Sequence, residues 1–465
     1  MRPHPPDPEE LGRGGAEKRP HPRPLSHLPP IPPPGEGRQE EAVSPVAGLP
    51  SPGDRAGGAA RGAGGEGAFL VPRLEKQGYA ADDIAARRRW IEEQTGAALT
   101  HAGASTLPGE QMQGNIENPV GAAQVPLGVA GPLLIHGEHA DGSFYVPLAT
   151  TEGALVRSYE RGMVAITRSG GATVRIHTDE NRVSPVFVCD DVAAAADLAR
   201  ALPGWIDEIR AAAESTTRHG KLLRLEVRPI GREVMVSFCY STGDAHGMNM
   251  IVKATDAACR WVLEHKAGGL ARRHYIFSGL ESEKRASGSL FAGGKGKKVI
   301  AGARLLARAT RAYLHATPQE MAEVWRHTVL GHLQAGALGY NGHLANGLAA
   351  VFIACGQDVA NLANSAVGVT CFEVTDDGDL YASVTLPALT VATVGGGTGL
   401  GTGRECLEML GCAGTGNAPK LAEIVAATLL AGELSMAGAI ASGEFVAAHE
   451  EYGRNRPPAR EEGAP

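Results

Sequence analysis

Acid–base chemistry is the first chemistry that this sequence could support, because two carboxylates stand in apolar surroundings. Asp358 directly follows an apolar stretch, and Glu152 stands within another. A carboxylate in such a place is costly unless it is paired or hydrogen-bonded, so each is either part of a buried network or functional. Structural pairing is the commoner explanation. His343 and Asn346, three residues apart and expected on one helix face, favour the functional one.

A glycine-rich run, Gly395–Gly403, could let the backbone approach a phosphate or a ring closely. Its spacing does not fit GxGxxG, and no strand–glycine–helix–acid unit surrounds it, which excludes a Rossmann nucleotide site. The sequence has no GxxxxGK[ST] segment, and the loop with Lys295, Lys297 and Lys298 lacks a phosphate-loop frame. A tight turn explains the glycines equally well, so both interpretations stay open.

The sequence gives little support for a metal site or for a nucleophilic serine or cysteine. His136 and His139 lie in a glycine-containing loop without an obvious third or fourth ligand, which indicates a surface turn. There is no GxSxG segment. The seven cysteines form no CxxC pair and predict buried thiols. The charged segments Glu281–Arg285 and Thr217-Arg218, taken alone, indicate solvated surface.

The composition argues against several classes of protein. The 465-residue chain has 44 Lys+Arg against 51 Asp+Glu, a formal net charge of −7, which argues against nucleic acid as the main partner. No uninterrupted apolar run approaches the roughly 18 residues of a membrane span, and the N-terminus lacks the apolar core of a signal peptide. We therefore expect a soluble chain with reduced thiols and no membrane partner.

The first 68 residues are expected to form a disordered arm. Of the 30 prolines, 15 lie in residues 1–60, and no aromatic residue precedes Phe69. So little apolar surface cannot offset the entropy cost of ordering the chain.

Sequence periodicity predicts the elements that position the candidate side chains. Helices are predicted over Ala81–Thr95, Thr151–Thr167, Val192–Ala201, Pro318–His332 and Ala345–Val359, and strands over Val186–Cys189, Leu222–Val227 and Glu233–Tyr240. The capping box Thr317-Pro318-Gln319-Glu320 marks one helix start, and Asp141-Gly142 indicates a hairpin turn. Strand–helix alternation in the middle of the chain predicts a small inserted α+β domain.

Six segments, in family order, resemble 3-hydroxy-3-methylglutaryl-CoA reductase between about Gly114 and Arg454. They are IENPVGAAQVPLGVAGPL (116–133), VPLATTEGALVRSYERG (146–162), STGDAHGMNM (241–250), EKRASGSLFAGGKGK (283–297), NGHLANGLAAVFIACGQD (341–358) and TVGGGTGLGTGRECLEMLG (393–411). Any one of them is a modest signal, whereas six in order are a strong one.

The resemblance implies roles for the charged candidates. Glu152 matches the family's proton-donating glutamate, Lys284 its catalytic lysine and Asp358 the aspartate between them. His343 and Asn346 match polar residues beside that group. Further substrate contacts are implied for Glu117, Asn118 and Arg182.

The resemblance also implies NADPH as the cofactor. Thr217-Arg218 falls on the family's Ser-Arg pair that grips the 2′-phosphate, and a guanidinium suits a phosphate dianion. The dinucleotide motif and the turn on the same side are matched by Asp244, His246, Gly247, Met248, Asn249, Met250, Gly395, Gly396, Gly397 and Thr398.

Such residues would reduce a thioester to an alcohol with two hydrides. Each hydride addition builds negative charge on a carbonyl oxygen, which Lys284 is suited to stabilise. Glu152 would deliver a proton, which requires burial and the nearby charge of Asp358 to keep its carboxyl protonated. Between the two hydrides a CoA thiolate leaves and must itself be protonated.

The sequence departs from the family at the group that protonates this thiolate. The family has a Gly-His-Leu-Val-x-x-His pattern, while this chain reads GEFVAAH over 443–449, so Glu444 takes the catalytic histidine's position and His449 the second histidine's. We hypothesise that Glu444, or His449 on a mobile tail, replaces the missing acid. Two smaller departures are His246 in place of Met and Glu283-Lys284-Arg285 in place of Asp-Lys-Lys.

The implied fold is α+β, with a large domain around a long central helix that contains Ala345–Val359 and an inserted ferredoxin-like small domain that binds NADPH. The predicted parts are the arm 1–68, an N-terminal helical segment 69–115, a large CoA- and substrate-binding domain 116–184 and 276–440, a small domain 185–275 and a mobile C-terminal tail 441–465.

The expected activity is NADPH-dependent reduction of 3-hydroxy-3-methylglutaryl-CoA to mevalonate and CoA by a homodimer or higher homo-oligomer. Membrane members of the family carry an anchor ahead of the catalytic region, and an arm unable to span a bilayer favours a cytoplasmic enzyme. One alternative is a reductase that uses another acyl-CoA or stops at the aldehyde. The other is a relative that binds CoA and NADPH without turnover.

Overall fold

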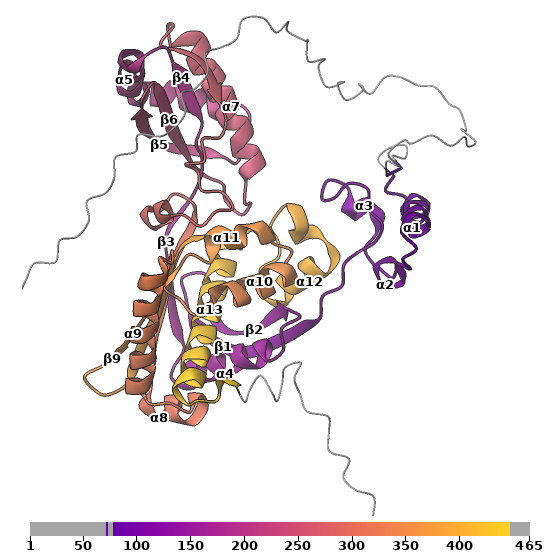
Figure 1. Ribbon diagram of the computed structural model, residues 1–465, viewed down its shortest axis with the longest axis vertical. Coiled ribbons are helices and arrows are strands. Elements are labelled where there is room, and N and C mark those ends of the chain that lie inside the picture. Colours follow the sequence, from indigo (N-terminus) through magenta and orange to yellow (C-terminus); the bar gives the residue numbers. More distant parts are fainter. Residues whose placement is uncertain (1–70, 73–77, 447–465) are drawn as a thin grey trace, which may run out of the picture. The chain divides into compact units, whose positions relative to one another are not determined.

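The computed structural model of the chain describes residues 71–72 and 78–446 (Figure 1). The chain divides into two units, Met1–Ala68 and Phe69–Pro465, and every helix and strand of the described residues belongs to the second. The predictions for the arm 1–68 and for His449 concern residues outside the described part.

Helices and strands both contribute to the described residues. The helices are α1 (Ala81–Thr95), α2 (Thr100–Gly103), α3 (Gly109–Met112), α4 (Leu155–Arg168), α5 (Val192–Ala201), α6 (Ile206–Glu214), α7 (Met248–His265), α8 (Ala307–Ala309), α9 (Pro318–Ala335), α10 (Leu344–Ala354), α11 (Leu362–Ser365), α12 (Gly401–Met409) and α13 (Ala418–Ala441). The strands are β1 (Leu127–His136), β2 (Asp141–Ala149), β3 (Ala172–Val183), β4 (Val186–Cys189), β5 (Lys221–Ile230), β6 (Glu233–Ser241), β7 (Ala271–Tyr275), β8 (Gly296–Leu305), β9 (Val369–Val374) and β10 (Leu380–Leu389).

The strands join in the order β7-β4-β6-β3-β8-β10-β9, with β5 on β6 and with β1 pairing both β2 and β3. Strand β3 is the link: most of it pairs with β8, while Asn181–Val183 pair with β6. Among these pairings only β1 with β3 is parallel.

Strands β4 to β7 and helices α5 to α7 enclose their own apolar core, separate from the core around β8, β10 and α13. Their strands lie in the antiparallel order β7-β4-β6-β5. The predictions of β4 and α5 are confirmed, and β5 and β6 extend slightly beyond their predicted bounds. The predicted strand–helix alternation is therefore present here.

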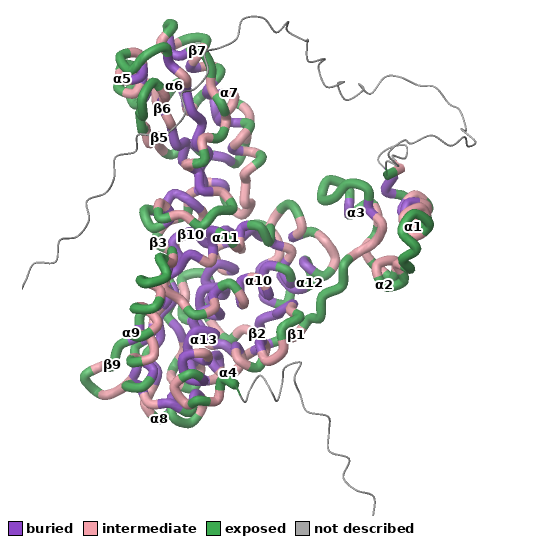
Figure 2. The backbone as a smooth tube through the Cα atoms, in the orientation of Figure 1, coloured by how far each residue is buried: buried purple, intermediate pink, exposed green. Residues whose placement is uncertain are grey.

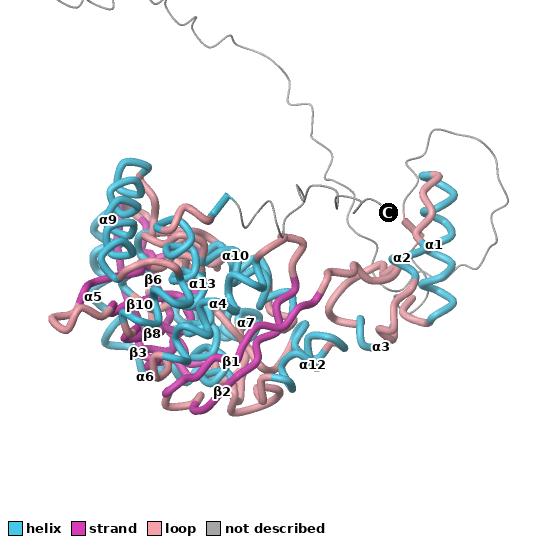
Figure 3. Tube along the Cα trace, turned by 90° about the horizontal axis from the view of Figure 1, so that it is seen from below, coloured by secondary structure: helices cyan, strands magenta, loops and turns pink. Residues whose placement is uncertain are grey.

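The long buried helix of the larger core is α13, and Figure 2 shows its buried course. It packs against α4 and against β8, β10 and β3 (Figure 3). Within the described part of the chain, α13 alone is long and apolar enough to cross a membrane, but 83% of its apolar window is buried inside the fold, as expected of a core helix. The long central helix was predicted around Ala345–Val359, which is wrong, because α10 has only 11 residues.

Two further helix boundaries differ from prediction, and the backbone explains both. Helix α4 begins at Leu155 because Ala154 adopts a left-handed conformation (φ 68°). Helix α10 ends at Ala354 because Gly356 turns the chain with φ 62°. By contrast α9 starts as predicted, since Thr317 and Glu320 form the reciprocal capping box.

The predicted hairpin turn at Asp141-Gly142 is misplaced, because both residues already pair with β1. The turn is residues 137–140, and a buried carboxylate holds it. Glu423 of α13 accepts the backbone N–H groups of Glu138 (3.0 Å), His139 (2.9 Å) and Ala140 (2.6 Å). Both of its oxygens thus accept backbone hydrogen bonds, which explains how a glutamate can be buried in an apolar helix.

Candidate active site

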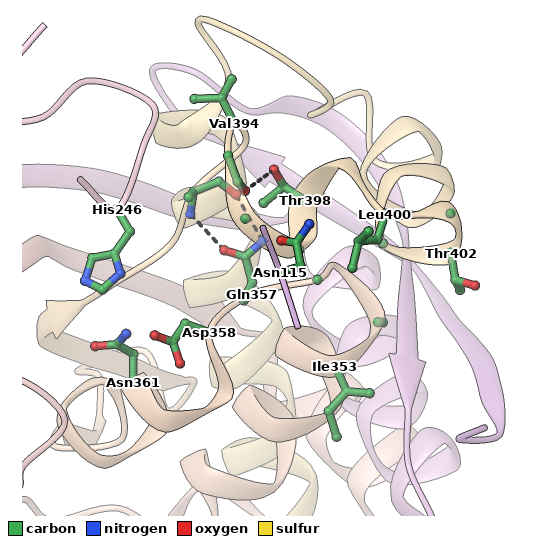
Figure 4. Close-up of a pocket in the computed structure, with 18 of the residues that line it drawn as sticks. Asn115, His246, Ile353, Gln357, Asp358, Asn361, Val394, Thr398, Leu400 and Thr402 are labelled. Atoms are coloured by element: carbon green, nitrogen blue, oxygen red, sulfur yellow. Dashed lines mark hydrogen bonds between the residues drawn. The ribbon is translucent and has the colours of Figure 1, made fainter. Parts of the chain in front are cut away.

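A cavity of about 1530 Å³ gathers several of the predicted residues. Its walls come mainly from residues within 104–127, 245–252, 283–284, 353–361 and 390–405. Figure 4 shows His246, Asp358 and Asn361 projecting into it. Pockets for one drug-sized ligand usually have about 300–1,000 Å³, so this cavity has room for parts of two larger molecules.

Lys284 and Asp358 face each other in this cavity, with Lys284 Nζ 2.8 Å from Asp358 Oδ2. Lys284 adopts a left-handed backbone conformation (φ 54°), a strain often found at functional positions. Asp358 accepts the N–H of Ala360 (3.1 Å) and so caps the short turn that follows it. The side chains are 44% and 41% exposed. Of the two interpretations that the sequence left open for Asp358, the buried network therefore does not apply to this exposed side chain.

Glu152 pairs with Asn346 instead, whose Nδ2 donates to both carboxylate oxygens (3.1 and 3.0 Å). Glu152 is exposed, and neither residue lines the cavity. Asn346 lies in the first turn of α10 and Asp358 just beyond its last turn, and the helical rise from Asn346 to Ala354 alone is about 12 Å. Within one chain the expected group of Glu152, Asp358 and Lys284 is therefore divided between the two ends of α10.

His343 does not share a helix face with Asn346, because it is the N-cap of α10 (φ −153°). Its Nε2 lies 2.8 Å from the carbonyl oxygen of Gly432. Glu433 of α13 accepts the backbone N–H groups of His343 (2.7 Å) and Gly342 (2.6 Å). Burial raises the pKa of Glu433, while the charge of His343 and these two hydrogen bonds oppose the rise. This buried glutamate fixes the start of α10.

A second lysine of the same loop, Lys295, belongs to a buried polar cluster with Glu283, His246 and Asn181. Lys295 Nζ donates to Asn181 Oδ1 (2.7 Å) and to Glu283 Oε2. The other oxygen of Glu283 lies 3.4 Å from His246 Nε2. Asn181 Nδ2 donates to the carbonyl oxygen of His246 (2.8 Å), so the cluster holds both the ring and the backbone of this histidine.

The charges of this cluster are balanced inside the protein. Burial alone would raise the pKa of Glu283, but the His246 contact and the charge of Lys295 outweigh it and lower the pKa to about 2. Burial lowers the pKa of Lys295, and the charge of Glu283 opposes this. Glu283 is therefore a fixed anion at neutral pH.

The predicted dinucleotide motif forms the start of α7. Gly247 is its N-cap with φ 77°, and a Cβ there would lie 2.6 Å from Thr242 Cγ2, so only glycine fits. Residues His246 to Met250 all line the cavity. A helix N-terminus of this length favours negative ligand groups.

Asp244 has a different position from the one predicted, because it does not line the cavity. Its carboxylate accepts the N–H groups of Gly416 (2.7 Å) and Ala418 (3.0 Å), and its carbonyl oxygen accepts the N–H of Thr393 (3.0 Å). Asp244 therefore ties the dinucleotide motif to the start of α13.

The glycine-rich run is a tight turn that packs against the Asp358 segment. Gly395 and Gly396 have positive φ (83° and 55°), and a Cβ on Gly397 would lie 2.6 Å from the carbonyl oxygen of Gly356. Thr398 Oγ1 donates to the carbonyl oxygen of Gly395 (2.7 Å; Figure 4). Since Gly395 to Thr398 also line the cavity, the turn interpretation is confirmed and does not exclude a ligand.

Other predicted residues lie outside the cavity walls. Thr217 Oγ1 accepts the N–H groups of His219 (3.2 Å) and Gly220 (3.1 Å), and the exposed Arg218 has no hydrogen bond or ion pair to any described residue. Glu117 and Asn118 are exposed. Neither pair lines the cavity.

Arg182 is buried next to the polar cluster rather than in the cavity wall. It donates to the carbonyl oxygen of Gly293 (3.3 Å) and to Ser289 Oγ (3.3 Å), and its buried Nε has no partner among the described residues. Burial lowers the pKa of Arg182.

Glu444, predicted to replace the catalytic histidine, contacts side chains outside the cavity. Its carboxylate lies 2.9 Å from His315 Nδ1 and 3.6 Å from Arg161 Nη1, and it does not line the cavity. The segment after Val446, with His449, is outside the described residues.

Sequence reasoning missed two positioning residues. Gln357 donates to the carbonyl oxygen of Ala392 (3.0 Å) and accepts its N–H (2.8 Å), which fastens the Asp358 segment to the glycine-rich turn (Figure 4). The sequence alone does not show that Lys295 has a different role from its neighbours Lys297 and Lys298. The burial of the Lys295 side chain depends on its packing against β3 and α7, which are distant in sequence. The GQD triplet could have drawn attention to Gln357.

Comparisons with known proteins agree on one family. A family model described as hydroxymethylglutaryl-coenzyme A reductase matches residues 83–454. The 3-hydroxy-3-methylglutaryl-coenzyme A reductase of Methanocaldococcus jannaschii is 45% identical over 373 residues, 79% of this chain and 92% of that protein. The Aeropyrum pernix protein of the same name is 43% identical over 396 residues, 83% of this chain and 94% of that one.

Solved structures are similar as well. A class II 3-hydroxy-3-methylglutaryl-CoA reductase from Streptococcus pneumoniae, bound to NADPH in open conformations, aligns with a TM-score of 0.58 at 21% identity. The alignment covers 76% of this chain and 86% of that one. At this identity the similarity establishes a shared fold.

Proposed function

The chain belongs to the hydroxymethylglutaryl-coenzyme A reductase family, and from that premise we propose that it reduces 3-hydroxy-3-methylglutaryl-CoA to mevalonate and CoA with NADPH. One observation carries the proposal: the ion pair of Lys284 and Asp358 lies in a cavity whose wall includes the dinucleotide motif and the glycine-rich turn. A thioester and a reduced nicotinamide could meet there beside a cation.

Lys284 is the proposed partner of the carbonyl oxygen of the substrate. Hydride addition turns that oxygen into an anion, and an ammonium already placed in the cavity stabilises the developing charge. Asp358 holds the ammonium in place and is exposed enough to exchange this contact for one with the substrate.

The small domain and its loops are proposed to bind NADPH. The strand order β7-β4-β6-β5 with helices between is that of a ferredoxin-like domain, and the N-terminus of α7 suits the diphosphate. Arg218, exposed and without a partner among described residues, is available for the 2′-phosphate. We propose that residues 185–275 form this domain. Residues 116–184 and 276–440 then form the CoA- and substrate-binding domain.

A second copy of the chain is proposed to complete the site. Because α10 separates Glu152 and Asn346 from the Lys284–Asp358 pair, one chain cannot bring them to one carbonyl carbon. In a homodimer, Glu152 of one subunit could approach Lys284 of the other, and the interface would supply the burial that a proton-donating carboxyl needs. We propose that this assembly works in the cytoplasm.

Stoichiometry tests the activity. Purified full-length protein is mixed with 3-hydroxy-3-methylglutaryl-CoA and NADPH, and absorbance at the nicotinamide band is followed together with the thiol released. We expect two NADPH oxidised for each CoA. No oxidation at high protein concentration would contradict the proposal.

Partial reduction is the second candidate, because Glu444 is bound by His315 and Arg161 outside the cavity. If no group in this chain protonates the leaving thiolate well, the enzyme would release an aldehyde slowly or bind both ligands without turnover. One NADPH for each CoA would identify the partial reductase.

A further inference from the structure

One buried amide in the cavity wall has no partner within the described chain. Asn361 ends the short 3-10 helix that follows Asp358, and its backbone N–H donates to the carbonyl oxygen of Asp358 (3.0 Å). The residue is 1% exposed and lines the cavity, yet neither Oδ1 nor Nδ2 has a hydrogen-bond partner among the described residues. A buried polar group without a partner is costly, so this amide requires an explanation.

The other two buried amides of this segment are paired inside the protein. Gln357 donates to the carbonyl oxygen of Ala392 (3.0 Å) and accepts the N–H of the same residue (2.8 Å). Asn364 Nδ2 donates to the carbonyl oxygen of Ala388 (3.0 Å). These two amides bind the backbone of the protein, whereas Asn361 keeps one acceptor and two donor hydrogens for a ligand.

The position of Asn361 indicates which part of a ligand would reach it. Asp358, at the start of the same turn, is the ion-pair partner of Lys284. Figure 4 shows the Asn361 side chain and the His246 ring projecting into the same space, and His246 belongs to the dinucleotide motif. A ligand group bound by Asn361 therefore lies between the proposed partner of the substrate carbonyl and the proposed cofactor site.

A primary carboxamide complements Asn361 best. It carries an acceptor oxygen and an NH₂ donor, so it can pair with both atoms of the asparagine amide at once. A carboxylate has acceptors only, so it would leave Oδ1 unpaired, and the charge of Asp358 would repel it. In reduced nicotinamide, the carboxamide stands on the ring carbon next to the one that gives up the hydride. The group that binds it must therefore lie close to the hydride acceptor.

Resting on the proposed function, we propose that Asn361 binds the carboxamide of the nicotinamide ring of NADPH. Its Nδ2 donates to the carboxamide oxygen, and its Oδ1 accepts from the carboxamide NH₂. This pair fixes the rotation of the ring and so presents the hydride-bearing carbon to the carbonyl beside Lys284. Asn361 is thus a cofactor-binding residue that orients the ring and takes no part in proton transfer.

Binding measurements with two cofactors test the proposal. The reduced 3-acetylpyridine analogue of NADPH keeps the oxygen but has a methyl group in place of NH₂. Isothermal titration calorimetry of the full-length wild type should show the analogue binding at least about 10-fold more weakly, because Asn361 Oδ1 then stays unpaired. Asn361→Leu keeps the size of the side chain, and Asn361→Ala leaves its space open. Both variants should bind the two cofactors with affinities within about threefold of each other.

Reaction rates should show the same pattern. The ring of the analogue has a different reduction potential, but this difference applies equally to the wild type and the variants. Comparing the four combinations of protein and cofactor therefore isolates the contact between the amide and the carboxamide. In both Asn361 variants kcat/KM for NADPH should fall about 10–100-fold, while the KM for the acyl-CoA thioester should stay within about threefold of the wild-type value.

The matched control is Asn364→Ala, which removes a buried amide of the same segment that binds the backbone instead of the cavity. It should lower the urea concentration at the midpoint of unfolding and leave the preference for NADPH over the analogue unchanged. Asn361→Leu should unfold at the wild-type midpoint or above it, because it removes no side-chain hydrogen bond to any described residue.

Two results would overturn the inference. One is an unchanged preference for NADPH over the analogue in both Asn361 variants. The other is a rise in the KM for the thioester alone, which would place Asn361 at the acyl group. A wild-type protein that neither binds nor oxidises NADPH would instead refute the proposed function, on which the role of Asn361 depends.

Discussion

Lys284 and Lys295 both lie between β7 and β8, but their positively charged side chains have different surroundings. Lys284 pairs with Asp358 in the cavity, and both side chains are more than two-fifths exposed. Lys295, eleven residues later, is fully buried and pairs with Glu283, which is 14% exposed. Each lysine has one carboxylate partner, but only the first has access to a ligand.

The difference lies in what each pair contributes. An exposed ion pair adds about 0–1 kcal/mol to stability, because solvent screens it, so Lys284 can change partners at little cost. A buried pair is hard to break, because removal of one partner leaves a charge without compensation. We therefore expect Lys284 to matter for reaction rate and Lys295 for stability and for the position of His246.

The largest effect should come from Lys284→Ala. Loss of the cation at the carbonyl oxygen should lower the rate of 3-hydroxy-3-methylglutaryl-CoA reduction about 10³-fold, roughly 4 kcal/mol of transition-state stabilisation. The free energy of unfolding in urea should change by less than about 1 kcal/mol. Steady-state NADPH oxidation and urea titration measure the two quantities.

Lys266→Ala is the control for this variant, since Lys266 also forms a lysine–glutamate pair, with Glu208 at 3.0 Å, outside the cavity. It should leave the rate unchanged. If Lys284→Ala retained most of the activity, the proposed role of Lys284 would be wrong.

The second effect should be on stability, in Lys295→Met. This change leaves the Glu283 carboxylate buried without its cation and should lower the free energy of unfolding by about 3 kcal/mol. The double variant Lys295→Met/Glu283→Met should recover much of this loss, because no charge is then stranded. Urea unfolding at fixed protein concentration measures both, and Lys284→Met serves as the exposed counterpart. If Lys295→Met and Lys284→Met lowered the free energy of unfolding equally, the proposed difference between the buried and the exposed ion pair would be wrong.

Local signals in the sequence predicted local structure well. The charged helix α1 and the capping box of α9 are specified by neighbouring residues, and both helices were predicted at their observed starts. The order of six motifs likewise identified the family.

Long-range packing could not be predicted in this way. The sequence left open whether Asp358 belongs to a buried network, whereas in the fold its exposed side chain pairs with Lys284. Nothing in the sequence around Lys295 indicated that Asn181 and Glu283 enclose it. In both cases residues distant in sequence decide the surroundings, and one sequence does not reveal their positions.

The smallest effect should distinguish two glycines of one turn. Because the exposed Lys284–Asp358 pair cannot hold its own geometry, the backbone around Gly356 must do so, and Gly397 packs against it. A Cβ at Gly397 would lie 2.6 Å from the carbonyl oxygen of Gly356, whereas a Cβ at Gly399 would have no heavy atom within 4 Å.

Gly397→Ala should therefore shift the Asp358 segment, lower the free energy of unfolding by about 1–2 kcal/mol and reduce kcat. Gly399→Ala should stay within about 0.5 kcal/mol of the wild type. Urea unfolding and steady-state kinetics measure these quantities. If Gly397→Ala instead raised only the KM for NADPH and left stability unchanged, Gly397 would be required for ligand approach rather than for packing. The Lys284–Asp358 pair would then depend on a different support, namely Gln357 and its two hydrogen bonds to Ala392.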